Sequence, residues 1–120
     1  LTMLPLAEEP GLQILDQDGN WMWPDPVENG VLVNTGEFLN RWTTGRFLPT
    51  PHRVVPPRHD RYSIATFFNP DSETSSEALD TCVSAGNPAK FETTSMQAYV
   101  EHYIDTNYLR GAGGTQENVA

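Results

Sequence analysis

Cysteine is almost absent from this chain of 120 residues, since Cys82 is the only one. A single thiol can form neither an internal disulfide nor a cysteine-based zinc site, and such a composition is typical of a reducing compartment. No run of apolar residues approaches the roughly 20 that a membrane-spanning helix needs. Residues 1–10 also lack the basic start and the small-residue cleavage site of a signal peptide. We therefore expect a cytoplasmic protein that does not act at a membrane.

Basic side chains are also few, because 7 Lys and Arg stand against 16 Asp and Glu, which gives a net charge of −9. A nucleic-acid backbone needs a basic face, so we expect no nucleic-acid partner. Between residues 41 and 61, however, five arginines face one acid, and the local charge is +4. These arginines are Arg41, Arg46, Arg53, Arg58 and Arg61. Such a cluster suits either a site for a small carboxylate or surface arginines that balance nearby acids.

Prolines and glycines are frequent, with 10 and 9 residues, and the runs between them are short and rich in β-branched or aromatic residues. This pattern predicts a mainly β chain. Residues 11–17 and 20–23 flank Asp18-Gly19, which favours a tight hairpin turn. Further strands are expected at residues 30–34, 52–55, 61–68 and 79–83. The second and third of these are joined by a short loop and are predicted to form an antiparallel pair.

Two helices are predicted in this β-rich chain. A short one is expected near residues 36–43, and an amphipathic one near residues 94–109, where apolar residues recur at three- and four-residue spacing. We expect residues 1–93 to form the core and residues 94–110 to provide a helix that packs on it. Residues 111–120 are predicted to be a flexible tail.

The residues from Arg61 to Phe68 alternate in a way that could build an anion site. In an extended strand, Arg61, Ser63 and Phe67 lie on one face. If that face points inward, Arg61 needs an anion, since a buried unpaired charge is costly. If the two strands pair, His52 faces the same cavity as a nitrogen ligand for a metal. An ordinary salt bridge, a surface hydroxyl and a half-buried histidine are the alternatives.

Residues 34–55 and 61–63 together match the pattern of a known family. The stretch from Asn34 to Val55, followed by residues 61–63, closely resembles the C-terminal half of the iron(II)/2-oxoglutarate-dependent dioxygenases of the isopenicillin N synthase-like superfamily. Four motifs carry the resemblance: Asn34-x-Gly-Glu37, Trp42-Thr-x-Gly45, Pro51-His-Arg-Val54 and Arg61-x-Ser63. Their combination is specific, whereas any one of them alone is weak. The resemblance covers residues 1–71 and continues weakly into the second predicted helix.

The resemblance implies a double-stranded β-helix, or jelly roll, in which two histidines and one carboxylate hold the iron. His52 would be the distal iron ligand, and Arg61 and Ser63 would bind the cosubstrate 2-oxoglutarate. The implied reaction consumes O2 and a small organic substrate and releases succinate and CO2, and hydroxylation is the expected outcome. Ascorbate is allowed as an additional cofactor. No catalytic residue is expected beyond the metal site.

Three neighbouring side chains have less specific roles. Asn34 would line the cavity near the cosubstrate, although a structural hydrogen bond at the strand end fits equally well. Phe67 would line the same cavity, with core packing as the alternative. Arg53, which follows His52, is expected to be a structural ion-pair partner of an acid, either Glu37 or Asp60.

The chain also departs from the family pattern. The family's other two iron ligands form a His-x-Asp motif just before the strand that resembles Leu1–Leu4, and the chain contains no such motif. We therefore expect these ligands upstream of Leu1 in a longer parent protein, and we expect the 120-residue chain on its own to be inactive. Two alternatives stay open: an oxidase in which the Arg-x-Ser pair binds the substrate carboxylate, and a truncated jelly roll that binds without catalysis. The sequence specifies neither the substrate, nor the choice among hydroxylation, desaturation and cyclisation, nor the oligomeric state.

Overall fold

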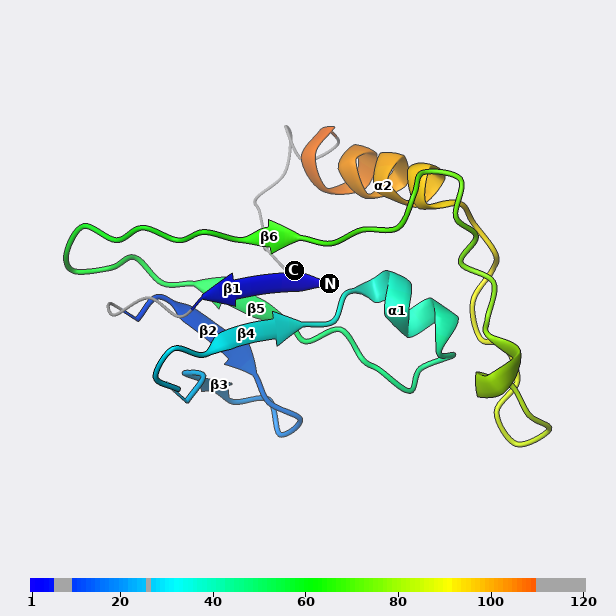
Figure 1. The fold of residues 1–120 in the computed structure, drawn as a ribbon, viewed down its shortest axis with the longest axis horizontal. Coiled ribbons are helices and arrows are strands. Elements are labelled where there is room, and N and C mark those ends of the chain that lie inside the picture. Colours follow the sequence, from blue (N-terminus) through cyan, green and yellow to red (C-terminus); the bar gives the residue numbers. More distant parts are fainter. Residues whose placement is uncertain (6–9, 26, 110–120) are drawn as a thin grey trace. The chain divides into compact units, whose positions relative to one another are not determined.

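The computed structural model describes residues 1–5, 10–25 and 27–109 (Figure 1). As expected, strands predominate and helices are few. In chain order the elements are β1 (Thr2–Pro5), β2 (Leu12–Leu15), β3 (Trp21–Met22), β4 (Val31–Asn34), α1 (Glu37–Trp42), β5 (His52–Val54), β6 (Thr66–Phe67), the 3-10 helix η1 (Asp80–Cys82), α2 (Met96–Ile104) and the π-helical segment η2 (Asp105–Leu109). No helix among the described residues is long and apolar enough to cross a membrane.

The described residues group into two compact units. Residues 1–36 and 48–68 carry all the named strands and are called the sheet unit below. Residues 37–47 and 69–109 carry the helices and are called the helix unit. The predicted division at residues 93 and 110 stays a prediction, and the predicted tail at residues 111–120 lies outside the described residues.

The sheet unit contains two antiparallel sheets, with strand orders β4-β1-β6 and β3-β2-β5. In the first sheet Thr2 lies opposite both Asn34 and Phe67, and in the second Ile14 lies opposite both Met22 and His52. Burial alternates along β1 and β4, as expected when one face of a sheet is covered and the other is open.

The predicted hairpin between β2 and β3 is confirmed. Oδ1 of Asp16 accepts hydrogen bonds from the backbone N–H groups of Asn20 and Asp18, at 2.7 and 2.9 Å. These bonds, the one from Asn20 above all, hold the pKa of Asp16 below its ordinary value. Gly19 has a φ of 83°, a left-handed conformation that glycine adopts without strain. The Asp-Gly pair therefore closes this turn as its sequence predicts.

The predicted pairing of residues 52–55 with residues 61–68 is wrong. β5 pairs with β2, and β6 is confined to Thr66–Phe67 and pairs with β1, so they lie in different sheets. The N–H of Val55 is already bonded to the carbonyl of Gly11 at 2.7 Å. Pro56 and Pro57, which follow, have no N–H to add to a ladder. β6 instead lies along the edge of β1, and next to it Phe68 and Leu1 exchange two backbone hydrogen bonds.

Both helices of the helix unit are confirmed near their predicted positions. The side chain of Ser95 caps α2 by accepting a hydrogen bond from the N–H of Ala98 at 3.2 Å. Phe38 of α1 is buried, and its ring packs edge-on against Trp42 and Tyr99, with centroids 5.0 and 6.0 Å away. The apolar spacing of the two predicted helices therefore corresponds to the faces that they bury against each other.

The strand predicted at residues 79–83 is wrong, because η1 occupies this position. The N–H of Cys82 bonds to the carbonyl of Leu79 at 2.8 Å, a three-residue turn. The N–H of Leu79 bonds to the carbonyl of Trp42 at 2.9 Å. This segment therefore meets the end of α1 rather than a strand edge, and it turns instead of extending.

Candidate functional site

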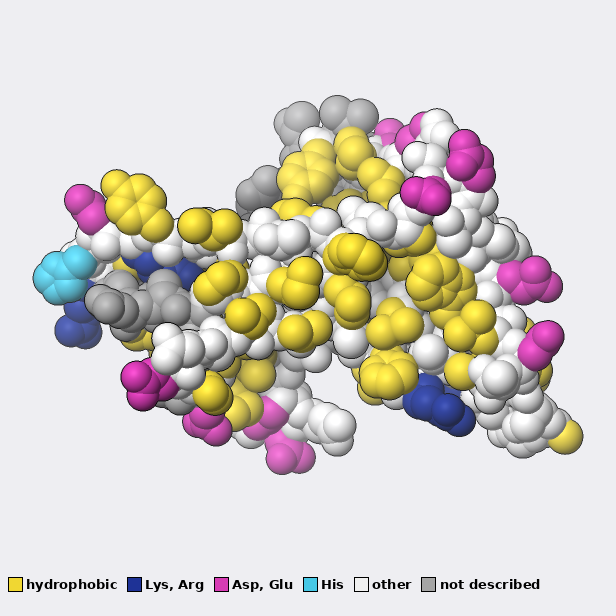
Figure 2. Space-filling view, viewed as in Figure 1, with side chains coloured by type: hydrophobic (Ala, Val, Ile, Leu, Met, Phe, Trp, Pro, Cys, Tyr) yellow, Lys and Arg dark blue, Asp and Glu magenta, His cyan; other side chains and the backbone are white. Residues whose placement is uncertain are grey.

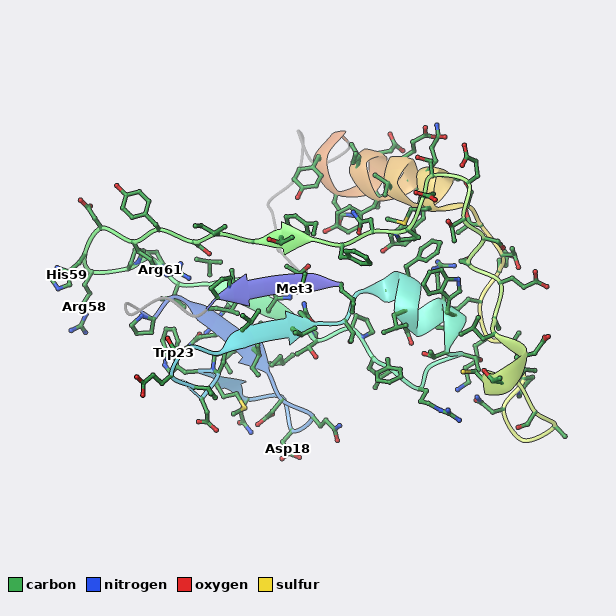
Figure 3. All side chains as sticks on the ribbon, in the orientation of Figure 1. Met3, Asp18, Trp23, Arg58, His59 and Arg61 are labelled. Carbon is green, nitrogen blue, oxygen red and sulfur yellow. The ribbon has the colours of Figure 1, made fainter. Side chains whose placement is uncertain are left out.

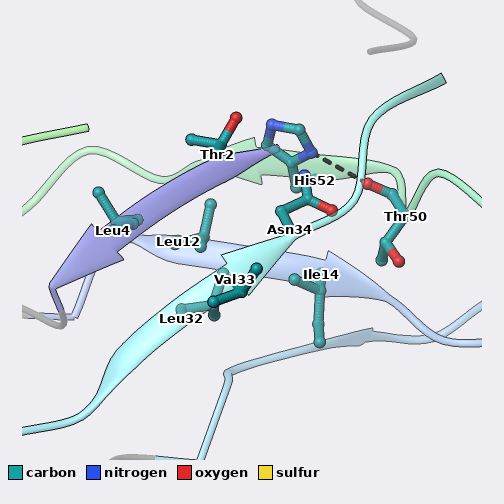
Figure 4. Close-up of a pocket in the computed structure, with 9 residues that line it drawn as sticks. All are labelled: Thr2, Leu4, Leu12, Ile14, Leu32, Val33, Asn34, Thr50 and His52. Carbon is teal, nitrogen blue, oxygen red and sulfur yellow. Dashed lines mark hydrogen bonds between the residues drawn. The ribbon is translucent and has the colours of Figure 1, made fainter. Parts of the chain in front are cut away.

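A cavity of about 160 Å³ lies between the two sheets of the sheet unit (Figure 4). Its lining comes from β1, β4, β2 and β5 and from the residues just before β5: Thr2, Leu4, Leu32, Val33, Asn34, Leu12, Ile14, Thr50 and His52. The strand register explains its polarity, because Thr2 lies opposite Asn34 whereas Leu4 lies opposite Leu32. One end of the cavity is therefore polar and the other apolar.

His52 lies at the polar end and is oriented by the backbone. Its Nδ1 is 3.0 Å from the carbonyl oxygen of Thr50. A carbonyl only accepts, so the hydrogen of this bond is on Nδ1. In the neutral ring, Nε2 then keeps its lone pair, which is the arrangement that a metal-binding histidine adopts. His52 therefore fits a position as a single metal ligand.

The rest of a metal site is not found in the described residues. Among them, no group of three His, Cys, Asp or Glu side chains could hold a metal ion. The described residues thus fit one ligand position of an iron centre and do not complete the centre by themselves. This agrees with the absence of a His-x-Asp motif from the sequence.

Arg61 lies against the start of β2 (Figure 3). A Cβ on Gly11 would be 2.6 Å from Nη1 of Arg61 and 2.7 Å from its Cζ, so the guanidinium occupies the space that a side chain at Gly11 would need. Nε of Arg61 is buried and has no hydrogen-bond partner among the described residues. A buried donor without a partner is costly, and an anionic ligand would satisfy it.

The structure brings some of the predicted site residues together. Asn34 and His52 line one cavity, whereas Arg61, Ser63 and Phe67 are not among its lining residues. Phe67 is 70% exposed and Ser63 is also exposed. Their proposed roles, like the Arg61–Ser63 clamp, therefore stay predictions.

Arg53 has partners other than the two predicted acids, Glu37 and Asp60. Its Nε donates to Oε1 of Gln13 at 2.9 Å, and its Cζ lies 4.2 Å from the ring centroid of Trp21. Within the described part of the chain, an amide and an indole thus replace the expected ion pair. Side-chain alternation along β2 places Gln13 and Ile14 on opposite faces, so the sequence could have indicated Gln13 as a partner of Arg53. That inference also requires the pairing of β2 with β5, which the sequence did not predict.

The sequence of this chain matches known proteins over most of its length. The family model of the 2OG-Fe(II) oxygenase superfamily matches residues 1–70, more than half of the chain. The chain belongs to this superfamily. Fe(II) and 2-oxoglutarate are the cofactor and cosubstrate of the 2OG-Fe(II) oxygenases.

Among curated relatives, 1-aminocyclopropane-1-carboxylate oxidase homolog 11 of Arabidopsis thaliana is 34% identical over 119 residues. The match covers 96% of this chain and 31% of that protein. The 2-oxoglutarate-Fe(II) type oxidoreductase hxnY of Emericella nidulans is 29% identical and is covered to 34%. This chain therefore spans about a third of the length of the curated relatives that it matches.

Solved structures that resemble this chain include proteins in complex with 2-oxoglutarate. A full-length protein of Neurospora crassa, solved in complex with alpha-KG, superposes with a TM-score of 0.76 at 32% identity, covering 86% of this chain and 34% of that one. JOX2 in complex with 2OG, Fe and JA superposes with a TM-score of 0.73 at 26% identity, covering 84% and 30%. The fold of this superfamily member is therefore shared with solved proteins that bind 2-oxoglutarate and, in one case, iron as well.

Proposed function

We infer that this chain is the C-terminal part of the catalytic domain of a non-haem Fe(II)/2-oxoglutarate-dependent dioxygenase with a jelly-roll fold. The parent enzyme oxidises a small organic substrate with O2, by hydroxylation in the expected case, and releases succinate and CO2. One observation carries the proposal: His52 lines a cavity between two sheets, its Nδ1 is bonded to a carbonyl, and its Nε2 has no hydrogen-bond partner among the described residues. Membership of the superfamily supports the same assignment.

In this proposal His52 provides one ligand of the iron through Nε2. The other two ligands come from a His-x-Asp motif upstream of Leu1 in the parent protein. Bound Fe(II) supplies the redox chemistry that couples decarboxylation of the 2-oxo acid to oxidation of the substrate. The carbonyl of Thr50 keeps the His52 ring in the tautomer that leaves Nε2 unprotonated.

Arg61 supports 2-oxoglutarate as the ligand through a donor that lacks a partner. Its guanidinium packs on Gly11, just before β2, and its buried Nε has no hydrogen-bond partner among the described residues. In this proposal Arg61 binds one carboxylate of the 2-oxo acid.

Binding of Fe(II) and 2-oxoglutarate to the intact parent protein, measured in the absence of O2, tests the proposal. Fe(II) followed by 2-oxoglutarate should produce a weak visible charge-transfer band. His52→Ala should lose this band, whereas His59→Ala should keep it, because His59 is exposed in the loop between β5 and β6 (Figure 3). Folded, iron-loaded protein without the band would contradict the proposal. Oxygen uptake without succinate release would instead favour an oxidase in which Arg61 and Ser63 hold the substrate carboxylate.

A further inference from the structure

The face of the second sheet that lies behind His52 carries a group of contacts whose role the reaction does not explain. β5 is an edge strand of three residues, all of them exposed. Because side chains alternate along a strand, a slip of one residue would turn His52 away from the cavity. A strand this short and this exposed needs a specific contact to fix its register.

Arg53 supplies contacts to both other strands of this sheet. Arg53 lies opposite Gln13 of β2, and its Nε donates to the Gln13 Oε1 at 2.9 Å. Its guanidinium also lies 4.2 Å from the ring centroid of Trp21, a residue of β3 that lies opposite Leu15. Gln13, Leu15 and Trp21 share one face of the sheet, whereas Ile14 and His52 occupy the other. One side chain therefore connects all three strands from behind the cavity.

These contacts select one register. A slip of one residue would turn Arg53 toward the cavity and away from both partners. A slip of two residues would keep His52 on its face, but Gln13 would then lie opposite Pro51 or Val55, and neither side chain can donate a hydrogen bond. The backbone ladder repeats every two residues and discriminates poorly against such a slip. The Arg53 side chain discriminates against both.

We propose that Arg53 is a positioning residue, which holds β5 in the register that presents His52 Nε2 to the cavity by binding Gln13 and stacking on Trp21. This inference rests on the proposed function, in which His52 binds iron. Arg53 acts through the strand and touches neither the metal nor the cosubstrate.

The test compares Fe(II) affinity among variants of the intact natural protein under anaerobic conditions. Arg53→Ala should weaken Fe(II) binding by about tenfold or more, the range seen when groups that orient a metal ligand are removed. Trp21→Leu should weaken it in the same direction, whereas Trp21→Phe, which keeps an aromatic face for the guanidinium, should restore most of the affinity. Val54→Ala is the matched control, because Val54 is 66% exposed on the same strand and contacts neither Gln13 nor Trp21 through a hydrogen bond or ring.

A second measurement separates positioning from general loss of stability. Nitrogen NMR of the His52 ring in the metal-free protein should report a protonated Nδ1 in the natural protein and in Trp21→Phe, and a mixture of tautomers in Arg53→Ala. If Arg53→Ala does not fold, Gln13→Ala provides the same comparison with a smaller change. Unchanged Fe(II) affinity and an unchanged ring signal in these variants would overturn the inference.

The two proposals fail in distinguishable ways. If His52→Ala leaves Fe(II) affinity unchanged, the metal role of His52 is wrong, and the inference about Arg53 falls with it. If His52→Ala abolishes binding while Arg53→Ala, Gln13→Ala and Trp21→Leu match Val54→Ala, the metal role stands and only the positioning role is wrong.

Discussion

The two units of this chain bury their side chains differently. In the helix unit Phe38 and Met96 are 7% and 8% exposed, and Thr44 is fully buried. In the sheet unit the structure describes no buried side chain, and apolar residues such as Val31 and Ile64 are 53% and 73% exposed. Hydrophobic side chains are visible on the surface over β1 and β4 (Figure 2). Side-chain packing therefore holds the helix unit together, whereas backbone pairing around an open cavity holds the sheet unit.

The largest expected effect tests this contrast directly. Phe38→Ala removes a buried ring that touches Trp42 and Tyr99, and it should lower the free energy of unfolding by about 3 kcal/mol or more. Val31→Ala in the sheet unit should cost below about 1 kcal/mol, because that side chain is half exposed and mainly contributes strand propensity. Denaturant unfolding of both variants measures the difference. Equal losses would contradict the contrast in packing.

In the sheet unit, a substitution that moves a side chain should affect ligand binding more than stability. Gly11→Ala places a Cβ 2.6 Å from Nη1 of Arg61. The flexible arginine can move away at little cost in stability, but its guanidinium then leaves the position in which it would bind a carboxylate. A hydrogen bond to a charged group contributes about 1.5 to 3 kcal/mol. The affinity for 2-oxoglutarate should therefore fall by about tenfold to a hundredfold, while thermal stability changes little.

Calorimetric titration of the intact, iron-loaded protein with 2-oxoglutarate measures this effect. Gly86→Ala is the matched control, because a Cβ there meets nothing within 4 Å. If Gly11→Ala binds 2-oxoglutarate as tightly as the control does, Arg61 does not hold the carboxylate in the position that the structure gives it.

The two units also differ in how much of their structure the sequence could predict. The Asp18-Gly19 turn and the two α-helices depend on residues close in the chain, and local signals located them. Strand partners are non-local, so the expected pairing of β5 with β6 was wrong although both strands exist. The segment at residues 79–83 has strand-like residues, but its contact with the end of α1 decides its conformation.

In the candidate site, too, the sequence predicted the local features and missed those that depend on distant parts of the chain. Motif spacing was enough to name His52, Arg61 and Ser63 as candidates. It could not show that the Thr50 carbonyl fixes the His52 ring or that Gly11 makes room for Arg61, because both depend on backbone positions. The role inferred for Arg53 likewise needs the register of three strands.

The smallest expected effect concerns a polar contact of the helix unit. The hydroxyl of Tyr99 donates to Oε2 of Glu37 at 3.3 Å. Partial burial, and then the negative charge of Glu37, raise the pKa of Tyr99 to about 12. An unfolded tyrosine loses its proton near pH 10. Between these values the folded state binds more protons than the unfolded state, so this contribution to stability is complete below about pH 10 and disappears as the pH rises toward 12.

Ultraviolet titration of tyrosinate in Tyr99→Phe should therefore show the loss of the group that titrates last. Tyr108→Phe is the control, because Tyr108 is 69% exposed and does not contact Glu37 through a hydrogen bond in the described part of the chain. Glu37→Gln should lower the pKa of Tyr99, since it removes a negative charge that disfavours tyrosinate. If Glu37→Gln leaves the late titration unchanged, burial alone sets the pKa of Tyr99. Ring packing between Phe38 and Tyr99, rather than the hydrogen bond to Glu37, would then stabilise the contact between α1 and α2.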